Sequence, residues 1–136
     1  MKLVVDTNII PMTLIKGSKA RSVLLNPAHE FFFPEYRVEE VERHLPLIME
    51  KTRLSEEEVR LAFRVLMTNL RVVPPGEIRS RLSEAEAIMG SIDESDVPFI
   101  AAALSLSCDG IWSDDKDFKR QRKVRVWTTG EMTHLS

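Results

Sequence analysis

Four acidic residues lie where predicted strands end or predicted helices begin, and together they could bind a metal ion. Asp6 and Asp115 each come shortly after an apolar run that is typical of a buried strand. Glu40 and Asp96 lie near the starts of predicted helices. In an open parallel sheet, ligands bind outside the carboxyl ends of the strands, where residues far apart in the sequence can meet. We therefore expect these four side chains to converge at one edge of a sheet.

A cluster of carboxylates requires a cation to offset its repulsion. Two carboxylates about 4 Å apart repel by roughly 4 kcal/mol at an effective dielectric constant of about 20. Ligands that are all oxygen atoms favour a hard cation, and Mg²⁺ in particular keeps several waters and leaves positions for phosphate oxygens. Mn²⁺ fits the same kind of site. Because such an ion can polarise a phosphodiester and lower the pKa of an attacking water, the pattern predicts metal-dependent phosphodiester chemistry.

Each acid also has a purely structural interpretation. Helix caps, turns and solvated helix faces use the same residue types, and these roles suit Asp96, Asp115, Asp117 and Glu40. Asp6 differs because it directly follows a buried strand and is followed by Thr7 and Asn8, which puts a charge where the chain leaves the core. For Asp6 the functional interpretation is therefore favoured.

The elements that must position these acids alternate between strand and helix along the chain. Short apolar runs predict strands at residues 2–5, 30–33, 70–73, 110–113 and 124–127. Helical periodicity predicts helices over residues 9–25 with a break at Gly17, 38–48, 55–67 with a capping box at its start, 78–89 and 97–106, and a short C-terminal helix. The alternation predicts an α/β domain with a mainly parallel central sheet.

The composition narrows the classes of protein further. The chain has 136 residues without a break in composition, so one domain is expected. Its single cysteine excludes an intramolecular disulfide and a zinc site rich in cysteines, and the first apolar run is too short for a signal peptide or a membrane span. We expect a soluble, cytoplasmic protein. Its net charge of −2 means that any RNA binding must be local.

The sequence resembles the PIN-domain family, which includes the toxins of VapBC toxin–antitoxin pairs and archaeal single-domain nucleases. Four blocks carry the resemblance in the expected order: residues 4–8 with Asp6, residues 34–41 with Glu40, Asp96 before residues 99–103, and residues 113–118 with Asp115. The match covers essentially the whole chain. It implies a single PIN domain over residues 1–136, with a three-layer α/β/α fold and a mainly parallel central sheet.

The resemblance also implies roles for individual residues. Asp6, Glu40, Asp96 and Asp115 correspond to the catalytic, metal-binding quartet, Asp117 to an auxiliary metal ligand, and Asn8 and Ser113 to supports that orient carboxylates or substrate. Three of these positions have competitors close by: Glu39 and Glu42 compete with Glu40, Asp93 with Asp96, and Asp114 with Asp115. Asp114, an additional acid in the last block, is expected to be exposed or to adjust metal affinity.

A basic run follows the last acidic block and could contact RNA phosphates. Its cations are Lys116, Lys119, Arg120, Arg122 and Lys123, with Arg125 just beyond. The alternative is a charged, solvated loop. A salt-dependent affinity for RNA would distinguish the two.

The resemblance predicts an endoribonuclease that uses Mg²⁺ or Mn²⁺ to hydrolyse RNA phosphodiester bonds. It could be the toxin of a VapBC-type pair with an antitoxin protein as partner, an RNA-processing nuclease without a toxin role, or a non-catalytic RNA-binding PIN scaffold. The family commonly forms homodimers, and the exposed part of the helices over residues 38–67 could supply an interface. A phosphotransfer enzyme of the haloacid dehalogenase or receiver type fits less well, because it needs a second acid close to Asp6, where the chain has Thr7-Asn8-Ile9.

Overall fold

Among the residues that the structure describes, 1–135, five strands form one sheet in which every neighbouring pair is parallel. The structure is a computed structural model, and Ser136, the last residue of the predicted domain, lies outside the described residues. The strands are β1 (Lys2–Val5), β2 (Glu30–Pro34), β3 (Leu70–Val73), β4 (Gly110–Trp112) and β5 (Val126–Trp127). Their order is β3-β2-β1-β4-β5. The predicted parallel sheet is therefore confirmed.

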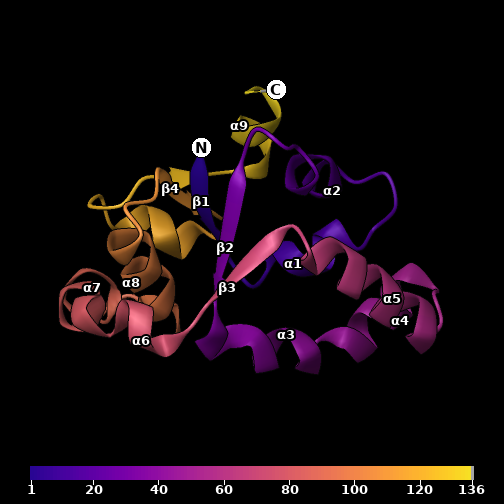
Figure 1. Ribbon diagram of the computed structural model, residues 1–136, viewed down its shortest axis with the longest axis horizontal. Helices are drawn as coiled ribbons and strands as arrows, with labels where there is room; N and C mark the ends of the chain where they lie inside the picture. The colour runs from indigo at the N-terminus through magenta and orange to yellow at the C-terminus, as the bar shows by residue number, and fades with distance from the viewer. Residues whose placement is uncertain (136) are drawn as a thin grey trace.

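Helices cover both faces of this sheet, as the three-layer α/β/α prediction requires. Figure 1 shows α6, α7 and α8 on one side of the strands and α1, α2, α4 and α5 on the other. The α-helices are α1 (Ile9–Thr13), α2 (Lys19–Leu24), α3 (Val38–Arg43), α4 (Leu45–Thr52), α5 (Glu56–Met67), α6 (Pro75–Ile78), α7 (Leu82–Met89), α8 (Val97–Ser105) and α9 (Thr129–Thr133). Short 3-10 turns are η1 (Glu35–Arg37), η2 (Arg79–Arg81), η3 (Glu94–Asp96) and η4 (Lys116–Arg120). No helix within residues 1–135 is long and apolar enough to cross a membrane.

The central strands are apolar along their whole length because helices cover them on both faces. The β1 side chains Leu3, Val4 and Val5 are fully buried, and the aromatic residues of β2 are nearly so. Continuous apolar runs of this kind are typical of strands in a parallel sheet, which cannot alternate between core and solvent. Helix α8 packs against β1, β2 and β4, and its alanines allow a close approach. The core therefore fixes the strand ends on which the acids depend.

The helix predicted over residues 38–48 is interrupted in the structure. Helix α3 ends at Arg43 and α4 begins at Leu45, with His44 between them and Pro46 in the first turn of α4. A proline inside a helix lacks the N–H that would bond to the preceding turn, and its ring clashes with a carbonyl there. The apolar periodicity continues across the break, which is why the sequence pattern indicated one helix.

The order of the strands reverses direction at β1 and β4. The chain leaves β1 toward β2 on one side, whereas β4 pairs with β1 on its other side. This reversal is the point at which open α/β sheets bind ligands. The pairing extends past the end of β1, because the backbone N–H of Asp6 donates to the carbonyl of Trp112 at 3.0 Å. Asp6 and the segment after β4 are therefore adjacent.

Strand β5 approaches β4 so closely that only a glycine fits at the start of β4. A Cβ atom added to Gly110 would lie 2.4 Å from the carbonyl oxygen of Arg125, and Gly110 has φ +157°. That carbonyl accepts the Ile111 N–H at 2.9 Å, so it cannot move away without loss of the pairing.

We predict that Gly110→Ala lowers the free energy of unfolding by about 1–3 kcal/mol, because the new methyl group forces β5 away from β4. Urea denaturation measures the change. Gly76→Ala is the matched control, since no atom lies within 4 Å of a Cβ added there, and it should change stability by less than about 1 kcal/mol. Equal effects of the two substitutions would contradict this account of the β4–β5 contact.

Candidate active site

Asp6 lies at the carboxyl end of β1 and is buried, with 2% of its surface exposed. Burial raises the pKa of its carboxyl to about 6, an effect opposed by the Ser113 hydrogen bond and increased by the negative charge of Asp115. The Ser113 Oγ donates to Asp6 Oδ2 at 2.7 Å. Backbone hydrogen bonds from Thr7 and Asn8 also lower the pKa. The carboxylate is therefore oriented but only partly compensated.

Ser113 connects Asp6 to Asp115. Besides donating to Asp6, the Ser113 Oγ accepts the backbone N–H of Asp115 at 3.0 Å. Asp115 then begins η4, where its Oδ1 accepts the N–H of Asp117 at 2.9 Å. Asp115 thus forms a turn, as the structural interpretation has it, but this turn engages only Oδ1 of its carboxylate. The Asp117 carboxylate lies 3.9 Å from the Arg120 guanidinium in a largely exposed pair.

Asp96 is the N-cap residue of α8, but its side chain makes no capping hydrogen bond. The capping of this segment falls instead to Asp93, whose Oδ1 accepts the N–H and the hydroxyl of Ser95. The Asp96 Oδ2 is buried and has no hydrogen-bond partner within residues 1–135. Burial, followed by the charges of Asp93, Asp6 and Asp115, raises the pKa of Asp96 to about 7. Asp96 therefore lies within electrostatic range of both other aspartates.

Glu40 lies on α3, which follows β2 and η1. Its side chain is 34% exposed, whereas Glu39 and Glu42 are exposed on the same helix. One Glu40 oxygen lies 3.8 Å from Nη1 of Arg37. The structure thus brings Asp6, Asp96 and Asp115 into electrostatic contact, while Glu40 faces Arg37.

The donor set suits a metal that needs few protein ligands. No three His, Cys, Asp or Glu side chains among residues 1–135 are grouped closely enough to hold an ion by themselves. Mg²⁺ is usually bound by one or two carboxylates, with waters and substrate phosphates completing the octahedron. Asp96 Oδ2 is a buried oxygen without a partner among residues 1–135, and burial together with neighbouring negative charge raises the pKa of both Asp6 and Asp96. The chemistry of these residues fits such an ion.

Asp114, the additional acid of the last block, has a structural role. Its two carboxylate oxygens accept the N–H and the hydroxyl of Thr129, at 2.8 and 2.7 Å. The Thr129 Oγ1 in turn accepts the indole N–H of the buried Trp112 at 3.0 Å. Asp114 therefore fastens the start of α9 to the end of β4, and neither of its oxygens is free to adjust a metal site.

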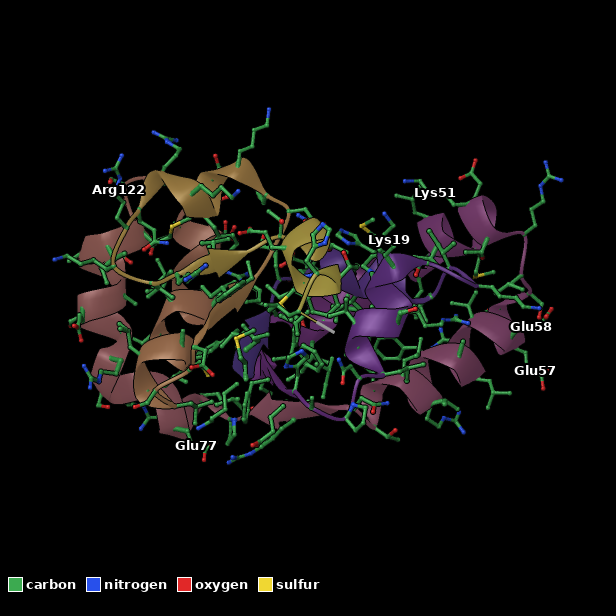
Figure 2. All side chains as sticks on the ribbon, turned by 90° about the horizontal axis from the view of Figure 1, so that it is seen from above. Lys19, Lys51, Glu57, Glu58, Glu77 and Arg122 are labelled. Carbon is green, nitrogen blue, oxygen red and sulfur yellow. The ribbon has the colours of Figure 1, made fainter. Side chains whose placement is uncertain are left out.

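The basic run is held in a defined loop by one buried glutamine. The Gln121 amide donates to the carbonyls of Phe118 and Val124, and its oxygen accepts the N–H groups of Lys123 and Val124. The loop exposes the cations Lys116, Lys119, Arg120, Arg122 and Lys123. Figure 2 shows Arg122 at the opposite end of the molecule from Lys51, Glu57 and Glu58. The exposed cations after Asp115 thus lie far from the acidic start of α5.

Arg37 is the residue at this site that the sequence analysis missed. It ends η1, directly before α3. The hydrogen bonds of Asp93 with Ser95 lower the pKa of Asp93, and the positive charge of Arg37 adds a smaller effect in the same direction. An arginine among glutamates in a helical segment looks like solvated surface, and no spacing in the sequence distinguishes it from the other arginines. Its position became visible only through its burial beside Glu40 and its electrostatic effect on Asp93.

We predict that the metal-free protein loses stability as the pH rises from 5 to 8. Asp96 has a folded-state pKa of about 7, above the ordinary value of 3.8, so the unfolded chain releases this proton first and stability falls until the pH passes 7. Asp96→Asn should remove about 2 kcal/mol of that fall. Urea denaturation in chelator at both pH values measures it.

The control for this experiment is Glu39→Gln, which neutralises an exposed acid on α3. It should keep the pH dependence of the wild type. If the stability of Asp96→Asn falls between pH 5 and 8 by as much as that of the wild type, Asp96 is not the group whose raised pKa causes the pH dependence.

Comparison with known proteins identifies the family and the fold. The family model described as "PIN domain" matches residues 4–135. Among solved structures, the chain is similar to a chain of the crystal structure of VapBC2 from Rickettsia felis bound to a DNA fragment from their promoter. The TM-score is 0.56 at 16% identity, and the likeness covers 94% of this chain and 98% of that chain.

The likeness to the Rickettsia felis structure shows the fold, since the identity is low. No curated protein matches the chain by sequence. The family model, in contrast, spans nearly every residue from β1 to α9. The predicted resemblance is therefore confirmed, and the chain belongs to the PIN-domain family.

Proposed function

We propose that the chain is an endoribonuclease that hydrolyses RNA phosphodiester bonds with Mg²⁺ or Mn²⁺. The observation that carries the proposal is the set of three aspartates whose charges act on one another near the carboxyl ends of β1 and β4, with a buried Asp96 oxygen that lacks a partner among residues 1–135. PIN domains are generally nucleases, which supports the reaction class. A non-catalytic RNA-binding scaffold has no need for this concentration of buried negative charge.

Each residue of the site has a role in this proposal. Asp6, Asp96 and Asp115 hold the ion, Glu40 completes the set from α3, and Asp117 is an auxiliary ligand. When bound, the ion supplies a Lewis acid that polarises the phosphodiester and lowers the pKa of water. Ser113 fixes the direction of the Asp6 carboxylate, and Asn8 supports the same carboxylate through its backbone.

The exposed cations of the basic loop provide a surface for the RNA backbone. Lys116, Lys119, Arg120, Arg122 and Lys123 begin one residue after Asp115, so phosphates on one side of the cleaved bond can reach them. Gln121 holds the loop through four hydrogen bonds, which lowers the entropy that binding must remove.

We predict that the purified protein cuts RNA with Mg²⁺ or Mn²⁺ and that chelator stops the reaction. Asp6→Asn and Asp96→Asn should each lower the rate by at least about a hundredfold, because each removes a charged oxygen ligand. Glu40→Gln should lower it as well. Gel analysis of a labelled RNA measures the rate at matched protein concentration.

Glu39→Gln and Glu42→Gln are the matched controls on α3, and both should cut RNA at the wild-type rate. Full metal-dependent cleavage by Asp6→Asn, or cleavage that chelator does not affect, would exclude the proposal. Loss of activity in Glu39→Gln or Glu42→Gln with retention in Glu40→Gln would move the fourth ligand to that residue.

A toxin role is a second proposal, supported by the similarity to a VapBC2 structure and by an apolar groove. The groove lies between α1–α2 and α5, and its lining includes Leu25, Leu61 and Val65, which are 47%, 58% and 56% exposed. An antitoxin protein with an apolar helical segment fits such a surface. The exposed side of α4 and α5 is also available to a second copy of the chain. A contact there would form the expected homodimer in the cytoplasm.

The toxin proposal predicts that induced expression of the wild-type chain stops bacterial growth. Expression of Asp6→Asn should not, because growth arrest then depends on RNA cleavage. Optical density after induction measures the effect at equal soluble expression. Normal growth with active wild-type enzyme would favour an RNA-processing role.

A further inference from the structure

Arg37 lies beside the acidic site with most of its hydrogen-bonding capacity unused. Its side chain is three-quarters buried, with 25% exposed. Its Nε is buried and has no hydrogen-bond partner within residues 1–135. The Glu40 carboxylate is 3.8 Å from Nη1, which is too long for a hydrogen bond, and the charge of Arg37 also acts on Asp93. The guanidinium thus lies beside Glu40 at the start of α3, within electrostatic range of Asp93.

Burial of an arginine in this position costs free energy unless a ligand accepts hydrogen bonds from its N–H groups. A guanidinium has five N–H donors in a planar fork, and burial without hydrogen bonds costs free energy. The other paired arginines of the chain are largely exposed, as in the Arg60–Glu56 and Arg81–Glu84 pairs on helix surfaces. Arg37 instead faces Glu40, which belongs to the candidate site, and its charge reaches Asp93. Of the unpaired nitrogen atoms of Arg37, only Nε is buried. Its Nη groups therefore remain accessible to a ligand.

The chemistry of the ligand follows from the charges nearby. A cation next to Asp93 and Glu40 opposes the binding of a metal at Asp96, so it does not serve metal affinity. It does favour an anion that approaches the metal from the α3 side. The planar fork of arginine matches the two non-bridging oxygens of a phosphate. A phosphodiester on the far side of the site from the basic loop has this chemistry.

We propose that Arg37 is a substrate-binding residue that contacts an RNA phosphate next to the cleaved one, on the side of the site formed by α3 and η3. This inference rests on the proposed ribonuclease function. It divides the contacts with the RNA backbone between two surfaces, the basic loop after Asp115 on one side and Arg37 on the other. The cleaved bond then lies between them, beside the three aspartates.

The test compares Arg37→Gln with Arg43→Gln, which replaces an exposed arginine at the end of α3, the helix that follows Arg37. Steady-state cleavage of a short single-stranded RNA should show a KM about tenfold higher for Arg37→Gln, with kcat within about twofold, because a charge-assisted contact to the bound substrate is lost. Arg43→Gln should match the wild type in both constants.

Binding measured without cleavage provides an independent readout. In an Asp6→Asn background, fluorescence anisotropy with a labelled RNA gives the dependence of affinity on salt. Arg37→Gln should reduce the slope of log K against log salt by about 0.7, the contribution of one phosphate contact to a single strand. Arg37→Lys should restore the slope, because it keeps the charge, but only part of KM, because it lacks the fork.

The outcomes separate this inference from the proposed function. Absence of chelator-sensitive cleavage by the wild type would overturn the ribonuclease proposal, whereas the salt slope would still report on Arg37. An unchanged KM and slope in Arg37→Gln would overturn the inference, as would a loss confined to kcat, which would make Arg37 a positioning residue for Glu40. Should Arg37→Gln fail to fold, Arg37→Lys decides in its place: a raised KM supports the contact and a wild-type KM excludes it.

Discussion

The burial of Asp6 and Asp96 beside the charge of Asp115 is the constraint on which the function of this fold depends. Burial, and to a smaller extent the repulsion among the carboxylates, raises the pKa of Asp6 to about 6 and that of Asp96 to about 7, so part of the folding free energy is used to keep these groups in place. Asp6 is partly compensated by Ser113 and by two backbone amides. Asp96 has no comparable support, since Oδ2 lacks a partner within residues 1–135. The folded chain therefore carries uncompensated negative charge at this site, which a bound cation neutralises.

The packing of the parallel sheet offsets the free-energy cost of this uncompensated charge. Strand β1 lies between β2 and β4, with fully buried side chains, so the position of Asp6 is fixed by the core. Helix α8 runs back across the same strands, and its first residue follows Asp96 directly. Burial of apolar side chains contributes about 1.5–3 kcal/mol per residue, which outweighs the cost of a few unfavourable charges. The acids are held by elements that would pack in the same way without them.

The sequence predicted the sheet because its strands are short, apolar and separated by helical periodicity, and it predicted the acids because they interrupt those runs. It could not decide between Asp93 and Asp96, because either could have capped α8, and the structure shows that Asp93 takes the local hydrogen bonds. Nor could it assign Asp114, whose partner Thr129 lies fifteen residues away. The break at His44 was hidden because apolar residues keep their spacing across it. In each case the deciding feature was a hydrogen-bond partner or a turn, and the spacing of apolar residues predicts neither.

The charge balance of the site includes the negative charge of the substrate, and Arg37 contributes to that balance. When Asp6, Asp96 and Asp115 are all ionised, a single divalent ion does not offset their combined charge, and an RNA phosphate adds to the negative side. A cation must then come either from a second metal ion or from the protein. Arg37 lies on the α3 side of the aspartates and the basic loop on the side of Asp115, so the chain places positive charge where the substrate, rather than the metal, needs it. An anionic polymer can approach a cluster of carboxylates only if such flanking charges lower the barrier, and the pairing of Glu40 with Arg37 keeps one of them in place before the substrate arrives.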